Sequence, residues 1–278
     1  MISHTVQAVS RASIFLTCTD GKYYSDEFVV QKNTLIRMLS GEMRIILPER
    51  TLVAGAGDTI FFPRLELAKV MKQSKDGQPY KSTAIYFTSE AVQLYFTRHH
   101  LKPVHDGRKP GISQLDPHPL LDSLFDSILP YFKLKNELPE NIAAGKVDEA
   151  IAILKEINVD LFNVLGNFEE PGKINLSEFM EKNFMYNIPL DQFSYLTGRS
   201  LTTFKRDFKK AYYVSPQKWL TQKRLELAHH QLIAQKRKAA DVYLEVGFEN
   251  LSHFSFAFKK QFGYPPSVIS SHENAQAL

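Results

Sequence analysis

The sequence of 278 residues contains a single cysteine, Cys18, and so cannot form a disulfide within the chain. It also lacks any run of about 20 apolar residues, the length that a membrane-spanning helix needs. The N-terminal residues, MISHTVQAVSRAS, do not contain the apolar segment of a secretory signal peptide. Because free thiols are typical of reducing compartments, these absences together predict a cytoplasmic protein with no membrane partner.

Residues 12–87 are rich in short runs of β-branched and aromatic residues, which are typical of strands. The runs are ASIFLTC, EFVV, NTLIRML, MRIILP, DTIFFP and STAIYF. Turn-forming pairs such as Asp20-Gly21 and Asp76-Gly77 separate them. Many short strands at close spacing favour a small β-barrel or sandwich. Residues 101–119, with their prolines and glycines, are expected to form a loop.

The strand region contains no histidine, and His-x-His occurs nowhere in the chain. A barrel that holds a catalytic metal needs clustered imidazole and carboxylate ligands. The sequence therefore predicts a protein that has no metal and no cofactor and is not an enzyme. Two alternatives stay open for the barrel interior, which either holds an organic ligand or is filled by side chains.

Two amphipathic stripes follow within residues 114–170. The first contains Leu120, Leu121, Leu124, Phe125, Ile128 and Phe132, and the second contains Val147, Ile151, Leu154, Leu161, Leu165 and Phe168, with Asn158 at a seam position. Leu138-Pro139 separates the stripes, which predicts a helical hairpin. The spacing resembles a short coiled-coil seam and predicts dimerisation, unless both stripes simply cover the barrel. The predicted interface residues are Ile151, Leu154, Leu161 and Leu165.

Charge is unevenly distributed along the chain. Residues 174–278 hold 14 Lys/Arg and 9 Asp/Glu, a net charge of +5, whereas residues 1–173 hold 20 and 21, a net charge of −1. A basic third beside a near-neutral remainder favours a polyanionic partner, although a solvated surface alone gives the same excess.

One helical pattern occurs twice in this basic third. The copies are SLTTFKRDFKKAY at 200–212 and NLSHFSFAFKKQF at 250–262. Large apolar residues recur at i, i+3 and i+7, so that each copy presents one stripe to a core. A shorter helical stretch that ends at a glycine precedes each copy, at 190–198 and 239–247. Helix, glycine-bearing turn and helix, occurring twice, predict two helix-turn-helix units.

A long helix is predicted between the two units. Ser215 is a suitable N-cap and Pro216 a suitable first helical residue, and the helix is expected to reach about Gln235. A rigid spacer of this kind places two recognition helices in successive major grooves, roughly 34 Å apart. Residues 169–173, Glu-Glu-Pro-Gly-Lys, are the predicted interdomain linker.

The second unit reads DVYLEVGFENLSHFSFAFKKQFGYPPSVI at 241–269. It resembles the pattern D-I-A-x-x-x-G-F…F-x-x-x-F-K-x-x-F-G-x-x-P of the AraC/XylS transcription regulators. The matching residues are Asp241, Gly247, Phe248, Phe254, Phe258, Lys259, Phe262, Gly263 and Pro266. The sequence departs from the family at Tyr243 (usually alanine), at Tyr213 (usually glycine) and at Arg199 (usually a larger apolar residue).

The resemblance implies an α+β multidomain protein. A cupin-like β-barrel sensor domain is expected at 1–113, since 39–64 is similar to the β-core of such domains. A helical hairpin for dimerisation is expected at 114–170, and an all-α double helix-turn-helix domain at 174–278.

The function implied by the resemblance is a sequence-specific transcription regulator, an activator. It would bind promoter DNA and RNA polymerase as a homodimer and respond to a small-molecule or protein effector. The alternative is a ligand-binding or enzymatic barrel whose helical tail serves an interaction without DNA.

The resemblance and the 100° helical period together assign contacts with DNA. Base contacts are predicted at Thr202, Lys205, Arg206, Ser252, His253 and Phe256. Phosphate contacts are predicted at Ser200, Lys209, Lys210, Lys223, Asn250, Lys259 and Lys260. Arg206 is expected to bind guanine with two hydrogen bonds, the alternatives being a phosphate contact or a solvated side chain. Phe256 occupies the equivalent outward position or packs inside the domain, and Arg224 either contacts DNA or holds the two units together.

Overall fold

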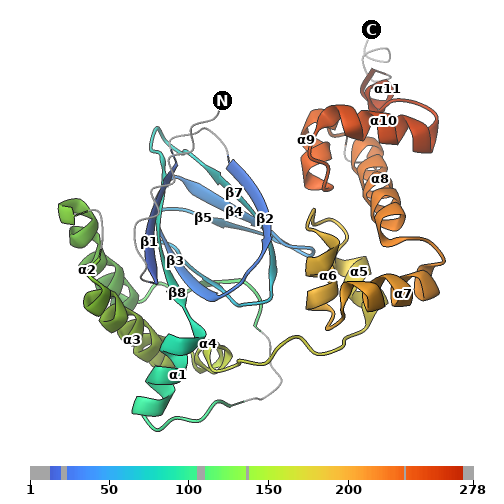
Figure 1. Ribbon diagram of the computed structural model, residues 1–278. Coiled ribbons are helices and arrows are strands. Elements are labelled where there is room, and N and C mark those ends of the chain that lie inside the picture. The colour runs from blue at the N-terminus through green and yellow to red at the C-terminus, as the bar shows by residue number, and fades with distance from the viewer. Residues whose placement is uncertain (1–12, 20–23, 105–109, 136–137, 235, 272–278) are drawn as a thin grey trace. The chain divides into compact units, whose positions relative to one another are not determined.

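The computed structural model describes residues 13–19, 24–104, 110–135, 138–234 and 236–271 (Figure 1). The chain divides into two compact units, Met1–Glu169 and Glu170–Leu278. Within the described ranges, the first unit contains two β-sheets and four helices, and the second unit contains helices alone. This arrangement confirms the predicted fold class, a β domain with helices followed by an all-α domain.

Two antiparallel sheets face one another in the first unit (Figure 1). The strand order is β1-β8-β3-β6-β9 in the five-stranded sheet and β2-β7-β4-β5 in the four-stranded sheet. The strands are β1 Ile14–Thr19, β2 Tyr24–Val29, β3 Asn33–Ser40, β4 Glu42–Ile46, β5 Thr51–Ala54, β6 Thr59–Phe62, β7 Leu67–Gln73, β8 Tyr80–Phe87 and β9 Ser113–Leu115. Because successive side chains of a strand point to opposite faces, each sheet has one face toward the other sheet and one face away from it.

Apolar side chains fill the space between the two sheets. Met38 and Ile60 of the five-stranded sheet share one buried cluster with Ile45 and Val70 of the four-stranded sheet. Of the two alternatives left open by the sequence, the structure therefore supports an interior filled by side chains.

Helices cover the other face of the five-stranded sheet (Figure 1). They are α1 Ser89–Arg98, α2 Pro119–Lys135, α3 Glu140–Ile157 and α4 Val159–Leu165. Leu35, Phe61 and Ile85 point to this face and share a buried cluster with the apolar stripes of the helices. The helical stripes are therefore part of the core of this unit. Complete burial of each such side chain contributes about 1.5–3 kcal/mol to the stability of the fold.

The four residues predicted to form a dimer interface lie inside this cluster. Ile151, Leu154, Leu161 and Leu165 are at most 2% exposed. The predicted second helix is also interrupted, because Asn158 ends α3 and caps α4, where its side-chain oxygen accepts a hydrogen bond from the Leu161 N–H (3.1 Å). These side chains pack within a single chain, which favours the alternative that the stripes cover the barrel, and a subunit interface at these residues stays a prediction.

Three strands, β5, β7 and β9, lie outside the predicted runs. In β7, Lys69 is buried and its ammonium pairs with the Glu27 carboxylate of β2 (2.6 Å). A charged residue at a buried position hides the apolar pattern by which a strand is recognised. β9 falls within the predicted loop and pairs with β6 through Thr59 and Leu115, a long-range contact without a local signal.

The second unit consists of helices arranged around one long helix, α8 (Figure 1). The helices are α5 Leu176–Asn183, α6 Leu190–Leu196, α7 Leu201–Tyr212, α8 Pro216–Ala234, α9 Ala239–Glu245, α10 Leu251–Phe262 and α11 Pro266–Ser271. α7 packs against the N-terminal part of α8, where Phe208 meets Trp219 with ring centroids 5.5 Å apart. α10 packs against its C-terminal part, where Phe254 and Phe258 join a cluster with Leu225. None of the helices in the described ranges combines the length and the apolar content that a membrane span requires.

The first apolar residue of each recognition-helix stripe is less buried than predicted. Leu201 and Leu251 are both exposed, whereas the phenylalanines that follow them are fully buried. Each leucine is the first residue of its helix, so it lies beyond the packed part of the stripe.

Tyr213 ends α7 in the left-handed conformation (φ 60°), where the second copy has Gly263 (φ 86°). A side chain destabilises this conformation by about 1–2 kcal/mol, an effect partly offset by the extra backbone freedom of glycine when unfolded. Because Tyr213 is 86% exposed, its removal costs little packing. We therefore expect Tyr213→Gly to raise the free energy of unfolding by about 0.5–1 kcal/mol.

Denaturant unfolding followed by the fluorescence of Trp219, the only tryptophan, measures this change. Gly263→Ala is the matched control and is expected to lower the free energy of unfolding. An unchanged or lower unfolding midpoint for Tyr213→Gly would show that the left-handed residue carries no strain.

Candidate nucleic-acid interface

A glycine makes the turn in each helix-turn-helix unit. Gly198 (φ 64°) precedes α7, and Gly247 (φ 88°) precedes α10. A Cβ atom at Gly198 would lie 2.4 Å from the backbone of Gly172, and one at Gly247 would lie 2.7 Å from the Met185 carbonyl oxygen. Both turns therefore exclude a side chain, which fixes the direction in which each recognition helix leaves its turn.

The exposed face of α7 brings the predicted contact residues together. Ser200 caps the helix, since its hydroxyl oxygen accepts a hydrogen bond from the Thr203 N–H (3.3 Å). The predicted contact residues Thr202, Lys205, Arg206, Lys209 and Lys210 are all exposed. Phe204 and Phe208 are buried on the opposite stripe. α7 thus presents hydroxyl, guanidinium and ammonium donors on one surface.

The exposed face of α10 has different chemistry. Asn250 caps the helix through the His253 N–H (2.7 Å). The predicted contact residues Ser252, His253, Phe256, Lys259 and Lys260 are exposed. Phe256 is 70% exposed, which excludes the alternative that it packs inside the domain. α10 therefore offers an aromatic ring where α7 offers a guanidinium.

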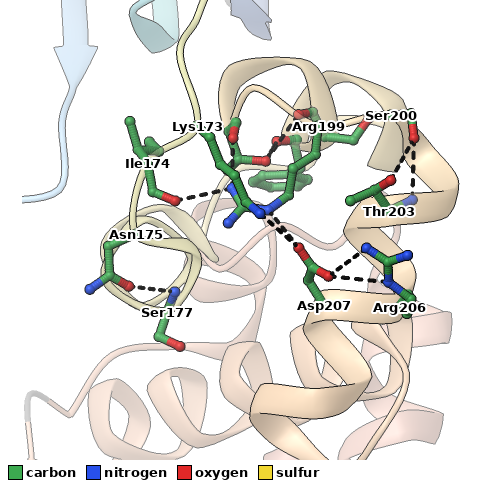
Figure 2. A network of polar contacts seen from close by, with 12 residues as sticks. Lys173, Ile174, Asn175, Ser177, Arg199, Ser200, Thr203, Arg206 and Asp207 are labelled. Atoms are coloured by element: carbon green, nitrogen blue, oxygen red, sulfur yellow. Dashed lines mark hydrogen bonds and ion pairs between the residues drawn. The ribbon is translucent and has the colours of Figure 1, made fainter.

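Arg206 belongs to a network of charged side chains beside α7 (Figure 2). Its Nε and Nη2 both lie near one carboxylate oxygen of Asp207, at 3.4 and 3.3 Å. The other oxygen of Asp207 accepts from Arg199 Nε (3.3 Å), and Lys173 Nζ lies 3.8 Å away. Partial burial raises the pKa of the Asp207 carboxyl, but hydrogen bonds from Arg199 and Arg206, together with the positive charges of Lys173 and Arg206, lower it below the ordinary value. The sequence pattern did not single out Asp207, and its only signal was the unusual arginine at position 199.

Arg224 of α8 joins the two helix-turn-helix units. Nε donates to the Phe184 carbonyl oxygen (2.9 Å), and Nη2 donates to that of Tyr186 (2.6 Å). Nη1 donates to the Gly247 carbonyl oxygen in the second turn (3.1 Å) and to the Asn187 side chain (3.1 Å). Since the residue is 7% exposed, Arg224 holds the units together and does not reach DNA.

Lys223 has a partner within the protein. Its ammonium pairs with Glu181 (2.9 Å) and lies 5.5 Å from the centroid of the Trp219 ring. A phosphate contact would therefore require Lys223 to exchange that carboxylate for a phosphate. Among the described residues, no three His, Cys, Asp or Glu side chains gather as metal ligands.

Comparisons with known proteins find a matching domain model for each of the two parts of the chain. Residues 195–271 match a model described as a helix-turn-helix domain, and residues 33–160 match one described as an ExsA N-terminal regulatory domain. These matches cover the two recognition helices and most of the β domain with its helices. Together they identify a helix-turn-helix domain that follows a region similar to the ExsA N-terminal regulatory domain.

The chain is similar to regulators of known families. It is 31% identical over 160 residues to the HTH-type transcriptional regulator ExsA of Pseudomonas aeruginosa, covering 57% of each chain. It is 29% identical over 138 residues to the virulence regulon transcriptional activator VirF of Yersinia enterocolitica, covering 48% of this chain and 50% of VirF. These matches thus span only about half the length of either relative. A crystal structure of a variant of apo ToxT from Vibrio cholerae aligns with 92% of this chain and 96% of its own, at 11% identity and a TM-score of 0.45. The two domain matches and the two relatives bear out the resemblance to the AraC/XylS family of transcription regulators.

Arg224→Lys is expected to lower the free energy of unfolding by about 2–4 kcal/mol, since one ammonium cannot replace a guanidinium that serves several diverging acceptors. Denaturation followed by Trp219 fluorescence measures the loss. Lys218→Met, which changes an exposed cation on the same helix, is the control and is expected to stay within about 0.5 kcal/mol of the parent. Equal stability of the two variants would mean that Arg224 does not connect the units.

Proposed function

We propose that this protein is a sequence-specific DNA-binding regulator of transcription. The observation that carries the proposal is the pair of capped helices, α7 and α10, each with an exposed polar face, held on one helix by the buried Arg224. A helix-turn-helix pair on a rigid spacer is suited to successive major grooves of one duplex. The net charge of +5 over 174–278 favours the approach of a polyanion.

The proposed base contacts are Thr202, Lys205, Arg206, Ser252, His253 and Phe256, and the proposed phosphate contacts are Ser200, Lys209, Lys210, Asn250, Lys259 and Lys260. All of them except the two caps carry their side-chain groups on the exposed faces of α7 and α10. Lys223 joins the phosphate contacts if DNA displaces Glu181. Helix N-termini such as those at Ser200 and Asn250 also attract phosphate through their free N–H groups.

We further propose that the protein activates transcription through RNA polymerase and acts as a homodimer in the cytoplasm. Support for activation comes from the relatives, one of which is named a transcriptional activator. Because the buried cluster between the sheets occupies their interior, we place the effector, a partner protein or a small molecule, on the surface of the first unit. The packed interior and the recognition helices disfavour the alternative, a ligand-binding or enzymatic barrel with a tail that does not bind DNA.

The test of this function is the base preference of the full-length protein toward duplexes selected from a random library. Arg206→Ala is expected to relax the preference by about 1–3 kcal/mol at one base pair in one half of the site, because a bidentate arginine–guanine contact gives discrimination of that size. Phe256→Ala is expected to weaken binding modestly and to alter preference mainly at a thymine in the other half, since a phenyl ring offers only apolar contact.

Lys209→Met is the matched control. Loss of a phosphate contact weakens binding to all sequences alike and reduces the salt slope by about 1. Selection that enriches no sequence would refute the proposed function. The two halves of the site are proposed to be read differently, one by Arg206 and the other by Phe256. If Arg206→Ala and Phe256→Ala lose base preference to the same extent, each in its own half, this difference is refuted.

A further inference from the structure

Asp207 stands between the protein interior and the proposed base-reading side chain, Arg206 (Figure 2). On its inner side it accepts from Arg199, whose side chain is 7% exposed. Arg199 is itself fixed, because Nη1 donates to the carbonyl oxygens of Thr197 (2.6 Å) and Ile174 (3.0 Å). The carboxylate of Asp207 is therefore held in place by a group that cannot readily move.

The outer oxygen of Asp207 faces Arg206, whose side chain is 69% exposed. The carboxylate engages Nε and Nη2 of the guanidinium. A guanidinium has five N–H groups, so three stay available, including the pair at its end that matches O6 and N7 of guanine. The contact with Asp207 is compatible with base recognition and restricts the rotation of a long, exposed side chain.

We propose that Asp207 is a positioning residue that sets the base specificity of α7, by holding the Arg206 guanidinium in the orientation that reads guanine. This inference rests on the proposed DNA-binding function. The negative charge of Asp207 also repels phosphates, so it lowers affinity for DNA in general while it raises the difference between the correct base and the others. Specificity and affinity are thus expected to change in opposite directions when the charge is removed.

The second helix-turn-helix unit provides an internal comparison. At the same offset of 50 residues it has Glu249, Phe256 and Ala257 in place of Arg199, Arg206 and Asp207. Glu249 accepts from the Asn187 side chain (3.1 Å). The arginine–aspartate–arginine arrangement belongs to the first unit, and the effect of Asp207 is therefore expected in one half of the site.

The test uses the full-length protein and the base pair at which Arg206→Ala loses preference. For Asp207→Asn we expect discrimination at that base pair to fall by about fivefold or more, a part of the roughly tenfold or larger preference that a bidentate contact supplies. Binding to unrelated duplex DNA is expected to stay equal or to become tighter. In the Arg206→Ala background, Asp207→Asn is expected to leave base preference unchanged, because the side chain that it positions is absent.

Asp207→Asn removes the carboxylate that pairs with Arg199 and could therefore destabilise the fold. A second variant separates this effect on folding from an effect on base preference. Arg199→Met with Asp207→Asn removes both charges and leaves no buried cation unpaired. This double variant is expected to show the same loss of discrimination at the same base pair, with preference in the α10 half unchanged.

The outcomes separate the two proposals. If the parent protein shows no base preference, the proposed function fails. If Arg206 controls preference but both Asp207 variants keep it, the positioning role is overturned and the proposed function stands. A parallel loss of melting temperature and of binding to every duplex, in both variants, likewise overturns the positioning role, because it would show that Asp207 acts only on folding.

Discussion

The guanidinium of Arg224 is the interaction on which the arrangement of the second unit depends. A buried cation costs several kcal/mol unless hydrogen bonds satisfy it. The acceptors come from two places, the segment before α6 and the turn before α10. Neither place alone provides the whole set, so the charge is satisfied only when both helix-turn-helix units are docked on α8. Separation of the units would leave a buried charge short of partners, which makes the docked state strongly preferred.

This constraint joins two similar units into one proposed DNA-reading surface with two different halves. α8 has 19 residues, and a helix of that length spans roughly 28 Å at about 1.5 Å per residue. The α7 half presents Arg206 together with Asp207, and the α10 half presents Phe256. In the proposed binding mode, the exchange of Arg206 for Phe256 gives polar readout in one groove and apolar readout in the next. The two copies also differ at the end of the recognition helix, where the first has Tyr213 in the left-handed conformation and the second has Gly263.

The helices of the second unit were predictable because their signals are local. Phe204, Phe208 and their counterparts repeat at helical spacing, and serine, asparagine and glycine mark the ends. The stripe containing Ile151 and Leu154 left two alternatives open, since such a stripe shows that a helix face is covered without showing what covers it, and the structure packs it within the chain. The partners of Arg224 are mainly backbone carbonyls, which carry no sequence signature. Asp207 resembles any solvated aspartate until the structure places Arg199 behind it.

The most direct test of the shared reading surface is the dependence of affinity on the distance between the two halves of the site. The full-length protein is titrated with selected operators that carry from none to about ten additional base pairs between the α7 and α10 half-sites, ten being close to one helical turn. If Arg224 and α8 hold the recognition helices at a fixed separation, affinity falls at every insertion and does not recover after a full turn. Recovery at one turn, or equal affinity at all spacings, would contradict a rigid connection between the two units.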